Sequence, residues 1–290
     1  MGVAGQDRSP QSLGSRIKSE GLNWIAVIAF SIVHTGAVAA LFFFSWPAII
    51  MAAVLYWIAL SWGIGMGYHR LLTHRSYTVP KPVEHFLAVC GCLALEGGPI
   101  NWVSTHRLHH QFSDREGDPH TPRDGKWWSH ITWMLVGNAT KCSPEECQRY
   151  SPDLMKDPFL VWLSSNNVVP SLIVGALLFA FGGLPFLLWG LFFRITIGLH
   201  ATWLVNSFTH FWGSRRYQTK DDSRNNWFVA LLSFGEGWHN NHHAHPTSAR
   251  HGLAWYELDM SWMMIWFLKA IRVAKSVRVA PFPPTAPKLD

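Results

Sequence analysis

The chain has 290 residues, of which 49% are hydrophobic and only 14% are charged, and its formal net charge is +6. Soluble domains usually carry about 25% charged residues, so this composition argues against an ordinary soluble enzyme. The apolar residues are collected into long stretches, which predicts a membrane protein. The positive charge suits anionic lipid headgroups, and we expect no nucleic-acid partner.

Four apolar stretches predict membrane-spanning helices, at about 22–45, 48–68, 159–181 and 185–212. The second contains no charged residue, and at about 1.5 Å per residue it would span roughly 31 Å, which is enough to cross a bilayer core. Between the third and fourth stretches, Gly182-Gly183-Leu184-Pro185 predicts a tight turn. We therefore expect an all-α membrane protein with four transmembrane helices and a helical cap that carries the histidine motifs.

The distribution of Lys and Arg predicts the orientation. Residues 1–21 contain three, 69–158 contain ten, 213–290 contain ten, and Arg194 is the remaining one. Because the two short connections between the stretches contain none, the positive-inside rule places the cap and both termini on the cytoplasmic side. This predicts a multi-pass integral membrane protein, in the plasma membrane if the source is bacterial. The four cysteines form no C-x-x-C motif and are expected to be free thiols.

Histidines gather in four short motifs: HRLLTH (69–74), HRLHH (106–110), NSFTH (206–210) and HNNHH (239–243). Each HxxHH motif has i, i+3, i+4 spacing, so we expect each to aim three imidazoles at one point from a helix face. Asn206 and His210 are expected to share a face in the same way. His69 and His74 are five residues apart, roughly 140° on a regular helix, so we expect them to serve two neighbouring ions.

These motifs provide ligands for two metals. A structural zinc takes four ligands, and imidazoles without carboxylates favour redox-active iron over Mg²⁺ or Ca²⁺. Nearby acids are expected to accept hydrogen bonds from imidazole N–H groups: Asp114, Glu116, Asp118 and Glu236. His120 and His245 lie close to the motifs and could brace them. The remaining histidines have no partner at helical spacing and are expected to be packed or interfacial: His34, His85, His130, His200 and His251.

The order of HRLLTH, HRLHH and HNNHH, with the surrounding stretches THRLHHQFSDREGDPHTPRDGKWWSH and FGEGWHNNHHAHP, resembles the integral-membrane fatty acyl desaturases of the Δ9 (stearoyl-type) branch. The resemblance covers about residues 48–256. We expect the chain to divide into a cytoplasmic head (1–21), a desaturase domain (22–256), and an amphipathic interfacial segment that ends in a disordered Pro-rich tail (257–290).

The resemblance implies O2-dependent desaturation of a saturated fatty acyl chain at Δ9, giving a cis monounsaturated product at a di-iron centre. Its implied iron ligands are His69, His74, His106, His109, His110, His210, His239, His242 and His243, with Asn206 approaching one iron through water. Trp102, Thr202 and Trp203 match positions that hold the bend of the acyl tunnel, and Glu96 stands where relatives carry Gln.

The implied substrate carrier is CoA, acyl carrier protein or a glycerolipid. Ser104-Thr105 replaces an Arg-Asp pair of the animal acyl-CoA enzymes, and the surrounding sequence is closer to the plant and cyanobacterial members. The chain has no flavin, iron–sulfur or haem motif, so a separate ferredoxin- or cytochrome b5-like donor is expected to dock on the basic cytoplasmic face.

Three alternatives stay open at this point. A membrane di-iron fatty acid or alkane hydroxylase would use a similar set of histidines and differ in inserting oxygen, although the NSFTH and DPH elements favour desaturation. A metal transporter would place polar ligands at the bilayer midplane of several spans. A membrane-anchored metal-binding or structural protein would need no acyl tunnel and no electron donor.

Overall fold

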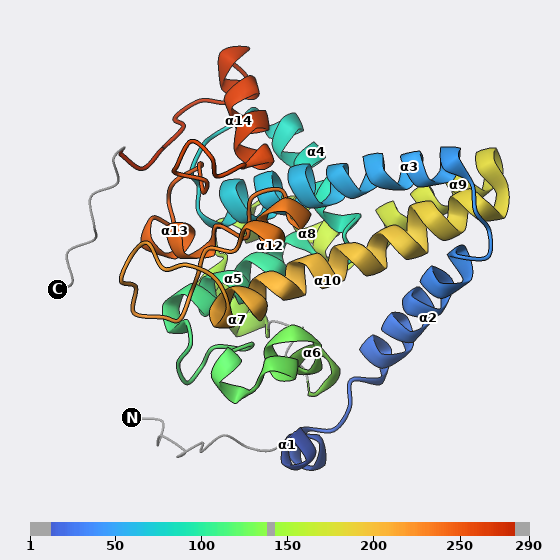
Figure 1. The fold of residues 1–290 in the computed structure, drawn as a ribbon, viewed down its shortest axis with the longest axis horizontal. Coiled ribbons are helices and arrows are strands. Elements are labelled where there is room, and N and C mark those ends of the chain that lie inside the picture. Colours follow the sequence, from blue (N-terminus) through green and yellow to red (C-terminus); the bar gives the residue numbers. More distant parts are fainter. Residues whose placement is uncertain (1–12, 138–142, 282–290) are drawn as a thin grey trace.

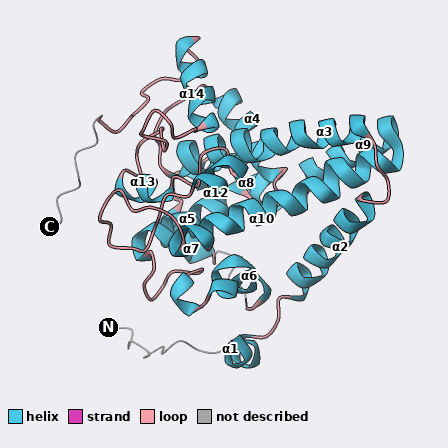
Figure 2. Ribbon diagram, in the orientation of Figure 1, coloured by secondary structure: helices cyan, strands magenta, loops and turns pink. Residues whose placement is uncertain are grey.

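The computed structural model describes residues 13–137 and 143–281, and within these residues it contains helices and no strand (Figure 2). The all-α class predicted from the sequence is confirmed. Cys142 and most of the predicted head and Pro-rich tail lie outside the described residues. Cys90 and Cys92 are free thiols, as predicted.

In chain order the elements are α1 (Leu13–Glu20), α2 (Trp24–Ala40), α3 (Trp46–Trp57), η1 (Ile58–Thr73), α4 (Lys81–Cys92), α5 (Pro99–Phe112), η2 (Pro122–Asp124), η3 (Trp128–Thr132), α6 (Trp133–Leu135), α7 (Pro144–Tyr150), η4 (Leu154–Lys156), α8 (Pro158–Ser165), α9 (Val169–Leu187), η5 (Leu188–Phe193), α10 (Arg194–Asn206), α11 (Phe208–Phe211), α12 (Trp227–Leu232), α13 (His239–Ala244) and α14 (Met260–Ala270).

Two helical segments are long and apolar enough, by length and composition, to cross a membrane. These are Trp46–Thr73, which has 28 residues and comprises α3 and η1, and Val169–Phe211, which has 43 residues. Helix α2 is also apolar but has only 17 residues. Figure 1 shows α2, α3, α9 and α10 extending to one side, while α5, α12 and α13 gather at the other end of the long helices.

The long segment Val169–Phe211 folds back on itself at Gly183. This residue has φ +65° and ψ −159°, a conformation that glycine adopts without a steric penalty. A Cβ on Gly190 would contact the Leu178 side chain, and one on Gly175 would contact Leu191. The two arms therefore pack against each other in opposite directions, and the predicted turn at 182–185 is confirmed.

Two predicted helices are interrupted. The stretch 159–181 is divided between α8 and α9, because Asn166 ends α8 and Pro170 stands in the first turn of α9, where its missing N–H is not needed. The stretch 185–212 breaks at Ser207, which has φ −109° and ψ −67°. Helix α10 therefore ends at Asn206, and His210 lies on the separate short helix α11.

Three glycines let other segments approach the helix that carries His69. Element η1 is a π-helix, and a Cβ on Gly63 would lie 2.4 Å from the backbone carbonyl carbon of Cys90 in α4. A Cβ on Gly67 would be 2.9 Å from the Leu87 carbonyl oxygen, and one on Gly65 would be 2.9 Å from Glu236 Oε1. Glycine at these positions brings α4 and Glu236 close to the end of the long apolar helix.

Replacing Gly63 by alanine is expected to destabilise the fold by about 1–3 kcal/mol, because the added carbon would overlap backbone that cannot rotate away. The matched control is Gly198→Ala in α10, where a Cβ would meet only Leu60, at an ordinary 3.6 Å. Thermal unfolding of both variants in detergent measures the effect. Equal melting temperatures for the two variants would contradict the tight crossing of η1 and α4.

Candidate metal centre

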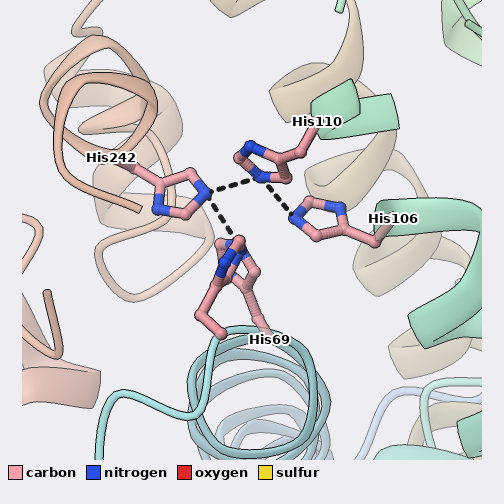
Figure 3. Close-up of side chains that lie close together, drawn as sticks. His69, His106, His110 and His242 are labelled. Carbon is pink, nitrogen blue, oxygen red and sulfur yellow. Dashed lines mark hydrogen bonds between the residues drawn. The ribbon is translucent and has the colours of Figure 1, made fainter. Parts of the chain in front are cut away.

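All nine histidines of the sequence motifs converge at the end of the long helices, in two groups. The first contains His69, His74, His106, His110 and His242, and the second contains His109, His210, His239 and His243. Within each group one ring nitrogen of every histidine lies within 4.8 Å of the others. Figure 3 shows four members of the first group, in which Nε2 of His242 is 3.0 Å from Nε2 of both His69 and His110.

The two HxxHH motifs do not each aim at one point, so that expectation was wrong. In α5 the i, i+4 pair His106 and His110 joins the five-histidine group, while His109 joins the four-histidine group. In α13 the arrangement is reversed, because His239 and His243 join the four-histidine group and His242 joins the five-histidine group. The two short helices face each other from different parts of the chain, and each contributes to both groups.

The structure also places His69 and His74 in one group, whereas a regular helix would have pointed them in different directions. In the π-helix η1, hydrogen bonds run from residue i+5 to residue i, and the His74 N–H donates to the His69 carbonyl at 3.1 Å. This wider turn brings residues five apart onto the same side, and the two ring centroids are 4.9 Å apart. Both histidines therefore belong to the five-histidine group.

Carboxylates hold the Nδ1 atoms of several of these histidines. Asp118 accepts from His109 and Asp114 accepts from His210, each at 3.0 Å, and Glu236 accepts from His69. Because an ionised carboxylate only accepts, Nδ1 carries the proton and Nε2 keeps a lone pair free for a metal. These are three of the four acids expected from the sequence, whereas Glu116 is exposed.

Sequence reasoning missed Asp221, which accepts from His243 Nδ1 at 2.8 Å. Asp221 lies in the loop that follows α11, 22 residues before its histidine, and no spacing rule connects the two.

Sequence reasoning also placed His251 among the packed or interfacial histidines. It is buried at the centre, with its ring 4.5 Å from His242 and its Nδ1 3.4 Å from Glu236.

The fully buried Arg70 donates to Glu236 at 2.8 Å and lies 2.9 Å from Asp259, which ties η1 to the segments before α13 and α14.

The other histidines named from the sequence fall into two classes. His120 packs beside the centre, with its ring 4.4 Å from that of His109, and its backbone N–H donates to Asp118. Burial lowers the pKa of His120 to about 3, so the ring is neutral. His245 lies farther out, against Tyr217, at a ring distance of 5.0 Å.

Arg107 lies between His106 and His109 and joins α5 to the end of η1. Its guanidinium donates to the carbonyls of Leu72 and Thr73, at the end of η1, and to Asp153. A cation at a helix C-terminus is favoured because it meets carbonyls that have no partner within the helix. Arg107 therefore fixes His74, the next residue after η1, relative to α5.

The two asparagines of HNNHH anchor the six-residue helix α13. Asn240 accepts from the backbone N–H groups of Arg216 and Tyr217, both at 2.8 Å. Asn241 donates to the His251 carbonyl and to Glu257, both at 2.9 Å. A helix this short is not stable by itself, so these side-chain bonds set the positions of its three histidines.

Burial keeps most of the nine rings neutral. It lowers the pKa well below the ordinary value for five of them, an effect reinforced by neighbouring imidazoles: His74, His106, His110, His239 and His242. Within the described residues, the buried Nε2 atoms of His74 and His243 have no hydrogen-bond partner. Neutral imidazoles with unsatisfied nitrogens that point together are a donor set that fits a transition metal.

Of the predicted tunnel residues, three lie together. The Glu96 carboxylate accepts from Trp102 Nε1 at 3.0 Å and from Thr202 Oγ1 at 2.7 Å, and so bridges α5 and α10. The Trp102 ring stacks on His106 at 4.9 Å. This bridge therefore reaches the five-histidine group. Asn206 is the last residue of α10 and is partly buried.

Trp203 is only 2% exposed and lies among a different set of side chains. His34, His200 and His130 form a hydrogen-bonded row around it, with ring-nitrogen distances of 3.2 and 3.1 Å, and the row ends on Ser207 Oγ. These three histidines were expected to be packed or interfacial. They come from α2, α10 and η3, so no spacing in the sequence indicates that they meet.

The family model described as fatty acid desaturase matches residues 44–266. The chain belongs to the fatty acid desaturase family. It is therefore an oxidoreductase that acts on fatty acyl chains, and the apolar helices together with the membership of this family indicate association with a membrane.

Several curated desaturases are similar to this one over most of its length. It is 46% identical, over 89% of this chain and 95% of the relative, to the sn-1 stearoyl-lipid 9-desaturase of Anabaena variabilis. It is 45% identical, over 89% of this chain and 81% of the relative, to the sn-1 stearoyl-lipid 9-desaturase of Synechocystis sp.. It is also 45% identical, over 90% of this chain and 70% of the relative, to the chloroplastic palmitoyl-monogalactosyldiacylglycerol delta-7 desaturase of Arabidopsis thaliana.

Replacing Glu96 by Gln is expected to change how stability depends on pH. Burial raises the Glu96 pKa to about 7, although Thr202 and Trp102 lower it, whereas the unfolded carboxyl titrates near its ordinary value of about 4.5. Between these values the native state binds a proton that the unfolded state lacks, so the wild type loses stability as pH rises. The stability of Glu96→Gln relative to wild type should therefore increase from about pH 4.5 to about pH 7 and stay level above it.

Unfolding midpoints of the two proteins in detergent, compared at several values from pH 5 to pH 8, measure this difference. Other titrating groups are common to both proteins and cancel. A difference that stays constant over this range would show that Glu96 is ionised throughout.

Proposed function

We propose that this desaturase introduces a cis double bond at Δ9 of a saturated acyl chain carried by a membrane glycerolipid, using O2, two electrons and two irons held by the nine histidines. The observation that carries the proposal is the convergence of nine imidazoles in two adjoining groups. His110 of one group and His243 of the other are stacked, with ring centroids 4.7 Å apart. The relatives named 9-desaturases support the position of the double bond.

Removing hydrogen from an unactivated methylene pair with O2 requires redox-active metal, and the two histidine groups would hold iron for this purpose. The protein's own contribution is binding and positioning. Asp114, Asp118 and Glu236 keep Nδ1–H groups turned away from the metals, and Asn206 would approach one iron through water. His120 braces His109 from the side, at 4.4 Å.

The acyl chain would pass beside the five-histidine group, with its bend at Trp102, Thr202 and Trp203. The Glu96 bridge holds α5 and α10 at a fixed separation next to His106. An acyl chain has no functional group to be recognised, so the position of the double bond would depend on which methylenes this wall places closest to the metals.

A glycerolipid carrier suits this chain better than CoA. Ser104, at the position where animal acyl-CoA enzymes carry an Arg-Asp pair, is fully buried and donates to Ser151 at 2.8 Å. It therefore offers no charged group to a CoA phosphate. The two 9-desaturases compared above are also named for lipid-bound stearoyl chains.

In the membrane, four spans would be formed by α2, by α3 with η1, and by the two arms of the hairpin at Gly183, with both termini and the histidine cap on the cytoplasmic side. Of the 24 Lys and Arg residues, 23 lie in the two terminal segments and the cap, and only Arg194 lies within a predicted span. This distribution supports the orientation. Helix α14 would lie at the surface of the membrane, since Trp266 and Phe267 are 58% and 50% exposed.

Electrons would come from a separate ferredoxin- or cytochrome b5-like donor. An open pocket of about 310 Å³ reaches both histidine groups from the surface, and its lining includes His74, His110 and His243. Arg107 and Asp221 also line it. A donor that docks over this pocket would lie next to imidazoles of both histidine groups.

The alternatives make different predictions about products. A hydroxylase would give a hydroxy acid, and a metal transporter would give no lipid product. The gathering of all nine histidines at one end of the long helices, rather than along them, favours an enzyme over a transporter.

Expression in a host that supplies a donor and saturated lipids is expected to give a new Δ9 monounsaturated acid. Gas chromatography–mass spectrometry of derivatised total fatty acids identifies the product and the bond position, and separating the lipid classes first identifies the carrier. His109→Ala should abolish the new product while the protein still inserts into the membrane, because one histidine group loses a ligand.

The matched control is His85→Ala. His85 is bound to Asp157 outside both groups, so this variant should keep most of its activity. Full activity in His109→Ala would contradict the assignment of the metal ligands, and a hydroxylated product would move the protein to the hydroxylase class.

A further inference from the structure

We infer that the two histidine groups hold their metals unequally, and that the four-histidine group fills first and more tightly than the five-histidine group. This inference rests on the proposed two-metal function and adds an order of binding to it. The number of ligands alone would predict tighter binding at the five-histidine group, because five imidazoles offer more donors than four. The carboxylates that contact each group reverse this order of affinity.

Three carboxylates contact the four-histidine group. Asp114, Asp118 and Asp221 bind the Nδ1 atoms of His210, His109 and His243 at 3.0, 3.0 and 2.8 Å. Within the described residues none of these three carboxylates forms an ion pair with Lys or Arg. Their negative charge is therefore directed at the histidine rings, and three of the four rings are held in the orientation that leaves Nε2 free.

In the part of the chain that the structure describes, one carboxylate contacts the five-histidine group. Glu236 binds His69 Nδ1, but it also accepts from Arg70 at 2.8 Å, and the guanidinium charge offsets that of the carboxylate. In the described part of the chain His242 Nδ1 is buried without a hydrogen-bond partner, as is His239 Nδ1 of the four-histidine group. This group is therefore less negative, and fewer of its rings are fixed by a partner.

The number of carboxylates and the number of oriented rings both favour tighter metal binding at the four-histidine group. A buried negative charge near a site stabilises a bound dication, because the interior screens the attraction poorly. A carboxylate on Nδ1 also orients the ring and makes Nε2 a stronger donor, and losing such a partner usually lowers metal affinity about 10- to 100-fold. Within the described residues the four-histidine group has three such partners, none of them in direct ion pair with Lys or Arg, whereas the five-histidine group has one that is shared with Arg70.

The test is a binding titration of the full chain in detergent, stripped of metal with a chelator and equilibrated without oxygen against buffered free Fe²⁺. Metal analysis counts the irons bound per chain. The expected result is two steps of one iron each, separated by at least tenfold in free Fe²⁺. His243→Ala should remove the tighter step, and His242→Ala should remove or weaken the other.

Asp221→Asn should shift the tighter step by about 10- to 100-fold and leave the weaker step unchanged, since Asn keeps the size of the side chain but not its charge. Asp114→Asn provides a second variant with the same expectation. Asp157→Asn is the control, because it removes a carboxylate that binds His85 at 2.9 Å, outside both groups, and should change neither step. Gel filtration and circular dichroism of the metal-free proteins select the variants that are folded.

Two equal steps in the wild type, or a shift of the weaker step in Asp221→Asn, would overturn the inference and leave the two-metal function intact. Fewer than two irons per chain in the wild type would overturn the two-metal function itself, and the inference with it. The counts per chain therefore separate the two failures.

Discussion

The structure depends on keeping nine imidazoles together where water cannot solvate them. A buried polar nitrogen without a partner destabilises the fold, so each ring must be satisfied by a neighbour or by a metal. Carboxylates satisfy Nδ1 on four of the rings, and Nε2 atoms of neighbouring rings, such as those of His69 and His242, lie 3.0 Å apart. The π-helical turn at His69, the glycine at position 65 and the bonds of Arg107 all help to keep these rings together.

The helix that carries His69 shows how the constraint shapes the backbone. The π-helical turn brings His74 onto the same side as His69, and Gly65 leaves room for Glu236 against the same helix. Arg107 then closes the end of η1 by binding its last carbonyls. Because η1 continues directly from the apolar helix α3, the position of the histidines at the end of this long helix is fixed without a flexible connection.

The polar partners also connect parts of the chain that are distant in sequence. Arg70, Glu236 and Asp259 join η1 to the segments that precede α13 and α14, over sequence separations of more than 160 residues. On the other side, Glu96 joins α5 to α10. An acyl chain offers nothing to recognise, so the accuracy of the reaction would depend on how firmly these bonds hold the helices that surround it.

The sequence by itself determined the helical class, the turn at Gly183 and the nine histidines that converge, because hydrophobic stretches, Gly-Pro turns and helical spacing are local properties of the chain. It did not determine how the histidines divide, since that depends on the π-helical turn at His69 and on two short helices that face each other. Asp221 and His251 were missed for the same reason. Only the tertiary structure, which brings loops from distant parts of the chain around buried polar rings, decided which partner each histidine has.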